Sequence, residues 1–351
     1  MKMIEQVIKN IVSPDEKIKA LAQDRLDSLT KPLGSLGRLE ELVKQIAGIK
    51  ASLDLELKNK VIFTLAADHG VTAEGVSPYP KEVTAQMVYN FLNGGAGINV
   101  LSRHAGARVV VADLGVAADL KPGKDLIIKK INYGTKNMAL GPAMLREEAV
   151  KSIEAGIEIF QQEYNKGIDI IGIGEMGIGN TTASSAITAI ITGKPLKEIT
   201  GRGAGLDDQG LAKKIRIIER AIKINQPNAQ DAIDILTKVG GFEIGGLIGI
   251  ILAAAAQKTP VVIDGFISGA ASLIACRIEP KVKNYLIASH CSVEKGHRVI
   301  LEYLQLAPLF DLNLRLGEGT GAALGINLCD AAIKIFSQMA TFKSAGVSEK
   351  I

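Results

Sequence analysis

The sequence predicts an α/β protein, in which helices cover both faces of a mostly parallel sheet. The first observation is that short apolar runs alternate with longer helical patterns from residue 60 onward. The second is that these runs are continuously apolar, as in strands buried on both faces. The third is an aliphatic composition, with 47% hydrophobic residues, 4% aromatic residues and no Trp. A chain of 351 residues accommodates one such domain with an appended lobe.

The segment before residue 58 is predicted to be helical. Asp15 and Glu16, which follow Pro14, form a helix start, and apolar residues recur after them at helical spacing. The Pro- and Gly-containing segment 31–37 interrupts this pattern. A second helix is predicted after it, with one apolar face made of Leu39, Leu42, Val43, Ile46 and Ile49.

Five continuous apolar runs are predicted to be the strands of the sheet. They cover residues 61–67, 108–113, 168–171, 261–263 and 285–288. Polar residues follow three of them: Asp68 and His69, Asp264, and His290. Ligands of open α/β sheets bind beyond the carboxyl ends of the strands, so these side chains are predicted to lie near a ligand. The apolar stretch 244–256 is shorter than the roughly 20 residues of a membrane helix and is predicted to be a buried helix.

The charge and cysteine patterns exclude several classes of protein. The net charge of +4 comes from 41 basic and 37 acidic residues spread along the chain, so nucleic-acid binding is not expected. Cys276, Cys291 and Cys329 form no CxxC pair and are expected to be idle thiols in a reducing compartment. The N-terminus has no long apolar run, so the protein is predicted to be cytoplasmic and to act away from membranes.

Three glycine-rich segments carry the main functional signal. They are residues 172–182 with Glu175, residues 200–205 with Arg202, and residues 317–321 with Glu318. Glycine lets the backbone approach a ligand closely, so that amide groups can converge on an anion. Because two of the segments contain a glutamate, they suggest a phosphorylated substrate held beside a carboxylate base.

The first of these segments has three open interpretations. Its GxGxxG spacing matches the dinucleotide fingerprint of an NAD-type protein, but no strand precedes the acidic residue expected about 20 positions later. The glycines could also form tight turns without a ligand. The favoured interpretation is phosphate binding by Gly177, Gly179 and the amides that open a helix near Thr181, because a helix N-terminus attracts anions.

The other two segments contain charged candidates. Arg202 and Lys213 are predicted to neutralise a phosphate, although Lys213 could equally be a solvated lysine beside Lys214. Glu318 precedes an apolar helix, where its charge could simply favour the helix dipole. The glycines on either side suggest room for a ligand instead. A glutamate shielded from water has a raised pKa and is a competent base near neutral pH.

A metal-dependent hydrolase is a further alternative from another class of enzyme. It would use the polar residues at the predicted strand ends, Asp68, His69, Asp264 and His290. The four histidines of the chain show no metal-binding spacing, so no metal is expected.

Together these motifs make the chain resemble the nicotinate-nucleotide:dimethylbenzimidazole phosphoribosyltransferases, which activate the lower base in cobamide assembly. The matching segments are 29–40, 67–71, 174–182, 200–203 and 317–321. The resemblance implies a doubly wound, Rossmann-like sheet with a small all-helical lobe from the two termini. The lobe would comprise residues 1–57 with about 335–351, and the α/β catalytic domain residues 58–334. It also implies a homodimer.

The resemblance further implies a reaction and a set of site residues. Nicotinate mononucleotide and 5,6-dimethylbenzimidazole, or a related base, would give α-ribazole 5′-phosphate and nicotinate. Nicotinate leaves a cationic pyridinium as a neutral ring, so no cofactor or metal is needed, and one carboxylate suffices to take the proton of the incoming base.

In this scheme Glu318 is the general base, and Glu175 stabilises charge on the ribose. The nucleotide and its phosphate are expected to contact Gly177, Gly179, Asn180, Thr181, Gly201, Arg202, Gly203, Lys213, Asp264 and His290. The base pocket is expected to contain Ser77, Tyr79, Gln86 and Leu316, and the bulk of Tyr79 bears on which base fits.

Overall fold

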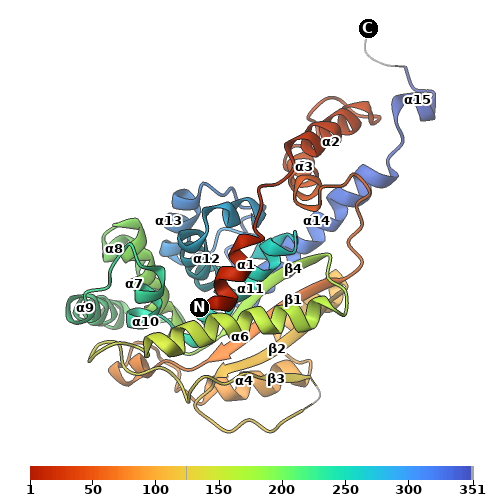
Figure 1. The fold of residues 1–351 in the computed structure, drawn as a ribbon. Coiled ribbons are helices and arrows are strands. Elements are labelled where there is room, and N and C mark those ends of the chain that lie inside the picture. The colour runs from red at the N-terminus through yellow and green to blue at the C-terminus, as the bar shows by residue number, and fades with distance from the viewer. Residues whose placement is uncertain (124, 349–351) are drawn as a thin grey trace.

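The computed structural model describes residues 1–123 and 125–348. Six strands form one parallel sheet in the order β3-β2-β1-β4-β5-β6 (Figure 1). The strands are β1 (Lys60–Ala67), β2 (Ala107–Gly115), β3 (Leu126–Ile128), β4 (Ile170–Met176), β5 (Val261–Ile263) and β6 (Leu286–Ala288). The strand order runs outward in both directions from the β1–β4 pair, so the predicted doubly wound fold is confirmed.

Helices cover both faces of the sheet because alternate strand residues point to opposite sides. One face packs against α1 (Lys2–Lys9), α6 (Arg146–Tyr164), α7 (Asn180–Thr192), α10 (Ala232–Val239), α11 (Phe242–Ala256), α12 (Phe266–Ile278) and α13 (Lys295–Leu304). The other packs against α4 (Val83–Leu92), α5 (Gly97–Ala105) and α14 (Thr320–Gln338). Val61 and Phe63 of β1 face the first group, and Ile62 faces the second.

The remaining elements are short connections and peripheral helices. They are α2 (Glu16–Ser28), α3 (Arg38–Lys50), α8 (Leu196–Ile199), α9 (Asp208–Asn225), α15 (Phe342–Ala345), and the 3₁₀ turns η1 (Gly70–Glu74) and η2 (Pro280–Tyr285). Helix α2 begins where the sequence predicts, because the Asp15 side chain accepts hydrogen bonds from the amides of Lys17 and Ile18.

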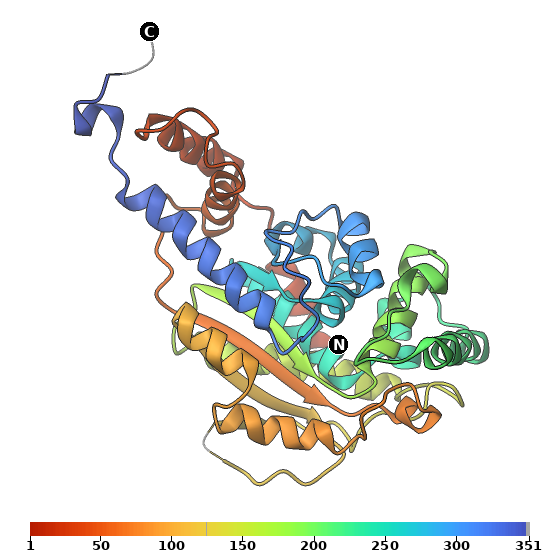
Figure 2. The same ribbon diagram turned by 180° about the vertical axis from the view of Figure 1, so that it is seen from behind.

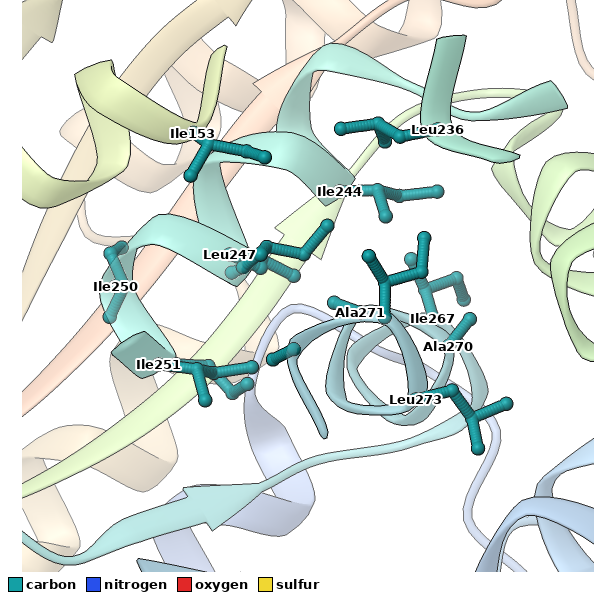
Figure 3. Close-up of a cluster of buried hydrophobic side chains, with 14 of the residues drawn as sticks. Ile153, Leu236, Ile244, Leu247, Ile250, Ile251, Ile267, Ala270, Ala271 and Leu273 are labelled. Atoms are coloured by element: carbon teal, nitrogen blue, oxygen red, sulfur yellow. The ribbon is translucent and has the colours of Figure 1, made fainter. Parts of the chain in front are cut away.

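The helix predicted at 244–256 is the centre of the larger apolar core. In α11 residues 242–255 are all buried, and the helix packs on the sheet and against the helices α6 and α12 (Figure 3). A Cβ atom at Gly156 of α6 would lie 2.0 Å from the carbonyl oxygen of Gly246, so these two helices touch through their backbones. In the part of the chain that the structure describes, no helix is both long and apolar enough to span a bilayer.

A small group of helices from both halves of the chain lies away from the sheet. Helices α2 and α3 pack on α14, which extends from the sheet toward them (Figure 2). Helix α1 lies elsewhere, against α6 and α11, because Ile4 and Val7 are part of the core on that face. The division at residues 57 and 335 stays a prediction, and residues 349–351 of the predicted lobe lie outside the described residues.

Two of the predicted strands need correction, and one strand was not predicted. The strand predicted at 168–171 is β4, which begins at Ile170 and continues to Met176, so Gly172 and Gly174 lie inside a strand and not in a loop. Glycine is needed there because a Cβ at Gly174 would lie 2.2 Å from the carbonyl oxygen of Glu318. Strand β6 starts one residue late, since Tyr285 ends η2, and the short strand β3 was not predicted.

Candidate active site

Polar side chains gather where β1, β4, β5 and β6 end. Asp68 and His69 follow β1, Glu175 lies at the end of β4, Asp264 follows β5, and His290 follows β6. All five are buried. The turn that leads into α14 lies against the same edge, because Thr64 of β1 donates a hydrogen bond of 2.9 Å to the carbonyl oxygen of Glu318. The candidate site therefore lies at the carboxyl ends of the strands, beside the β1–β4 pair from which the strand order runs outward in both directions.

Glu318 lies in an unusual backbone conformation. The φ angles of Gly317, Glu318 and Gly319 are +84°, +64° and +99°. The left-handed region is uncommon for a residue with a side chain. The Glu318 Oε2 atom accepts a hydrogen bond of 3.0 Å from the amide of Ile98, in the first turn of α5. Burial raises the pKa of this carboxyl above its ordinary value, and the hydrogen bond from Ile98 opposes that shift.

Glu175 is the second carboxyl group of the site. It accepts a hydrogen bond from the Asn180 side chain, and its Oε1 atom lies 2.8 Å from where a Cβ of Gly317 would be. Burial, and then the nearby carboxylates of Glu243 and Asp264, raise its pKa to about 8. The group is therefore protonated at neutral pH. A cationic substrate next to it would favour the ionised form that the predicted electrostatic role requires.

Asp264 faces the start of α14. Its Oδ1 atom accepts hydrogen bonds from the amides of Gly321 and Ala322, at 2.7 and 3.2 Å, and its Oδ2 atom accepts one from Gly319 at 3.1 Å. Burial raises the pKa of Asp264 to about 7, although these three amides favour the ionised form.

The two histidines at the strand ends have separate environments. The His69 Nε2 atom lies 2.6 Å from the Glu243 Oε1 atom, and both side chains are closed to solvent. His290 stacks on Phe310, and its Nδ1 atom lies 2.9 Å from the Ser289 hydroxyl oxygen. Burial lowers the pKa of His290 to about 4, so its imidazole is neutral at physiological pH.

The second part of the site lies around the loop at residues 200–205. Lys214 of α9 is fully buried, and its Nζ atom donates a hydrogen bond of 2.8 Å to the Thr181 hydroxyl in the first turn of α7. The amide of Gly203 donates one of 3.0 Å to the carboxylate of Glu294. Burial lowers the pKa of Lys214 to about 8, against the effect of Glu294. This loop thus already holds an anionic group beside a buried cation.

Lys214 is the functional candidate that sequence reasoning missed. From the sequence it is only a solvated neighbour of Lys213. The structure reverses the two, since Lys213 is exposed and Lys214 is buried. Helical spacing could have indicated that Lys214 is buried. It lies three, four and seven residues before the buried Ile217, Ile218 and Ala221, so all four share one face of α9.

Arg202 and Lys213 do not join this cluster. The Arg202 guanidinium closes its own turn, with a hydrogen bond of 2.9 Å to the Leu206 carbonyl and an ion pair with Asp208, and it is half exposed. The Lys213 Nζ atom lies beside Gly75, the residue that follows η1.

The glycines of the loop and of the α7 start are placed by packing. A Cβ at Gly201 would lie 2.1 Å from the Glu294 carboxylate, and one at Gly177 would lie 2.4 Å from the Ala67 carbonyl oxygen. Gly179 caps α7 with a φ of +94°. These contacts require glycine before any ligand is considered.

The predicted base pocket is only partly brought together. A Cβ at Gly97 would lie 2.8 Å from a methyl carbon of Leu316 and 3.4 Å from the Glu318 Oε2 atom, so Leu316 lies beside the proposed base. Tyr79 is 53% exposed and Gln86 is exposed on α4. The hydroxyl of half-buried Ser77 accepts a hydrogen bond of 3.2 Å from the Tyr79 amide.

The two alternative site chemistries lose their geometric basis. The dinucleotide fingerprint needs its glycines in the turn after a strand, whereas residues 172–176 form the end of β4. The proposed metal ligands have other partners, His69 with Glu243 and Asp264 with the α14 amides. Across residues 1–123 and 125–348, no three His, Cys, Asp or Glu side chains are grouped so that they could hold a metal ion.

Comparisons with known proteins agree with the fold and with the resemblance to a family. A family model described as "Phosphoribosyltransferase" matches residues 11–347. Relatives named nicotinate-nucleotide–dimethylbenzimidazole phosphoribosyltransferase include one from Roseiflexus sp., 56% identical over 100% of this chain and 99% of the relative. Another, from Geobacter sulfurreducens, is 53% identical over 99% of each chain.

A solved structure is similar over almost the whole fold. The crystal structure of CobT from Thermus thermophilus has a TM-score of 0.92 and 43% identity, and it covers 95% of this chain and 100% of its own. The resemblance inferred from the motifs is therefore confirmed: this chain belongs to the nicotinate-nucleotide–dimethylbenzimidazole phosphoribosyltransferase family.

Proposed function

We propose that this protein transfers the 5-phosphoribosyl group of nicotinate mononucleotide to 5,6-dimethylbenzimidazole or a related base. The products are α-ribazole 5′-phosphate and nicotinate, and the reaction belongs to the assembly of the nucleotide loop of cobalamin. Full-length similarity to relatives with this name supports the proposal. The observation that carries it in the structure is the buried carboxyl group of Glu318, held at the edge where the strand order reverses.

The chemistry needs one proton acceptor. One nitrogen of the incoming azole attacks C1′ of the ribose with its lone pair, while the C1′–nitrogen bond to the pyridinium breaks and its electron pair stays on nicotinate. The N–H proton of the azole passes to the Glu318 carboxylate. Among the described residues, the Ile98 amide donates its hydrogen bond to Oε2 of this carboxylate, and Oε1 is available for the proton. Attack opposite the departing ring inverts the anomeric carbon from β to α.

The structure favours Lys214 over Lys213 as the anchor of the substrate phosphate. Lys214 lies between the two glycine-rich segments, at the Thr181 hydroxyl and close to Gly203. Within the described part of the chain its ammonium has one hydrogen-bond acceptor, which leaves two N–H donors for an anion. Cationic Lys214 therefore supplies the charge that the sequence assigns to Lys213 and Arg202.

The Glu318→Gln variant tests the proposed base. We expect kcat to fall by about 10²–10⁴-fold, because the amide has nearly the same shape and cannot accept the proton, while the affinity for nicotinate mononucleotide stays within about threefold. Release of nicotinate, measured by HPLC with a panel of bases, reports both turnover and base preference.

The pH profile sharpens this test. In the wild type, kcat/KM should rise with pH through the raised pKa of Glu318, because only the ionised carboxylate accepts a proton. The residual activity of the variant should lack this acid limb. Turnover of Glu318→Gln at the wild-type rate would refute the assignment of the base.

The predicted homodimer and cytoplasmic location belong to this proposal. The proposed substrate is a charged nucleotide, which does not cross membranes unaided. Light scattering after gel filtration would decide between monomer and dimer, and cell fractionation would test the location.

A further inference from the structure

The turn at residues 317–319, which carries Glu318, is strained, so other groups must hold it in this conformation. Three consecutive residues, Gly317, Glu318 and Gly319, have positive φ. For Glu318 this conformation is unfavourable in isolation, and such strain persists only where the surroundings over-determine it. The groups that fix this turn therefore decide where the carboxylate lies.

Asp264 fixes the turn on its C-terminal side. It comes from the end of β5 and is 1% exposed, and its two oxygens accept hydrogen bonds from the amides of Gly319, Gly321 and Ala322. These amides open α14, where a helix leaves donors without intrahelical partners. Both oxygens of Asp264 are thus bonded to the backbone on one side of Glu318.

Thr64 holds the backbone of Glu318 itself in place. Its side chain is fully buried on β1 and donates a hydrogen bond to the carbonyl oxygen of Glu318. On the neighbouring strand β4, Gly174 provides the space into which that carbonyl group fits. Three adjacent strands, β1, β4 and β5, therefore meet the same turn.

We propose that Asp264 and Thr64 are positioning residues, which together hold the 317–319 turn so that the Glu318 carboxylate faces the incoming base. Asp264 then acts through the backbone of α14 and not as the nucleotide contact that the sequence suggests. This inference rests on the proposed role of Glu318 as the proton acceptor. A displacement of about 1 Å in a reacting group is enough to cost about 100-fold in rate.

Asp264→Asn is the first test. The NH₂ group of the asparagine would face at least one of the three amide donors, so the turn loses a hydrogen bond and gains a repulsive contact. We expect kcat to fall about 100-fold, with the KM for nicotinate mononucleotide within about threefold. Asp330→Asn is the matched control, because Asp330 lies in the middle of α14, away from its N-terminus, and pairs with Lys60 and Lys334. Its kcat should stay within about twofold of the wild type.

A double-mutant cycle separates positioning from a general structural role. If Asp264 acts through Glu318, then Asp264→Asn should lower the residual rate of Glu318→Gln by less than about threefold. An undiminished 100-fold effect in the Glu318→Gln background would overturn the proposal.

Two substitutions of Thr64 provide a second test, which holds even if Asp264→Asn fails to fold. Thr64→Val removes the hydroxyl at constant shape and should lower kcat about tenfold, whereas Thr64→Ser should restore most of the rate. Equal rates for the two variants would contradict the role of this hydroxyl.

A spectroscopic measurement makes the test independent of turnover. In protein labelled with ¹³C-glutamate, the carboxyl resonance that is lost in Glu318→Gln belongs to Glu318. Thr64→Val and Asp264→Asn should shift this resonance, and Asp330→Asn should not. An unshifted resonance in both site variants would refute the inference. An inactive wild type with the expected shifts would refute only the proposed function.

Discussion

The core around α11 and the sheet edge that carries Glu318 are both closed to solvent, and they differ in what burial does to their side chains. Around α11 the side chains are aliphatic, among them Leu247, Ile250 and Ile251 (Figure 3). Their burial stabilises the fold by about 25 cal/mol per Å² of apolar surface. At the sheet edge, burial instead raises the pKa of Glu175 to about 8 and that of Asp264 to about 7.

Glycines serve the two regions differently as well. Gly156 and Gly246 let α6 and α11 touch through their backbones, which closes the core. Gly174 and Gly317 make room for the backbone and the carboxyl groups of the site. The same residue type therefore supports packing in one region and the placement of reactive groups in the other. Substitutions in the two regions should differ in whether stability or activity changes.

Gly156→Ala should have the largest effect on stability. The new Cβ would lie 2.0 Å from a backbone carbonyl oxygen, which cannot move without separating α6 from α11. We expect the free energy of unfolding to fall by about 3 kcal/mol. Denaturant titration measures it, with Gly141→Ala as the control because nothing lies within 4 Å of that position. Equal denaturation midpoints for the two variants would show that the contact between α6 and α11 tolerates a side chain at residue 156.

Lys214→Met should weaken substrate binding without a comparable loss of stability. Methionine fills the buried space, but the cation next to Thr181 is lost. We expect the Kd for nicotinate mononucleotide to rise about 100-fold, or about 2.7 kcal/mol. Lys213→Met should change it by less than about threefold, since that side chain is exposed. Calorimetric titration measures both Kd values. A larger increase in Kd for Lys213→Met than for Lys214→Met would identify Lys213 as the phosphate ligand instead.

Glu175→Gln should change the free energy of unfolding by an amount that depends on pH. The folded state keeps the Glu175 proton up to a pKa of about 8, whereas the unfolded chain releases it near 4.5. Stability from this group is therefore fully present below pH 4.5 and is lost as the pH rises toward 8. Glutamine resembles the protonated form, so the variant should keep its stability while that of the wild type falls as the pH rises toward 8. The two should be equal at acidic pH, and a difference independent of pH would contradict the buried neutral carboxyl.

Much of the fold could be predicted because strands β1, β2 and β5 are continuous apolar runs, and their burial on both faces follows from that pattern. The full extent of β4 could not be predicted. Its residues 172–176 contain two glycines and a glutamate, a composition that favours a turn locally. They form a strand because the turn of Glu318 packs on Gly174, a contact 144 residues away in the chain (318 − 174).

The candidate site was predicted unevenly for a similar reason. Glu318 and Glu175 stand out in the sequence because glycines flank them, whereas Lys214 resembles its exposed neighbour Lys213. The assignment of both catalytic roles stays a prediction until the variants are measured.

The sequence by itself determined the class of fold, the family, and the edge of the sheet at which the polar residues gather, because apolar periodicity and glycine motifs are local properties of the chain. Only the tertiary structure decided which lysine is buried, which backbone groups Asp264 binds, and how far the carboxyl pKa values rise. These depend on groups brought together from distant segments, since hydrogen bonding and desolvation act over a few ångströms of space and not along the chain.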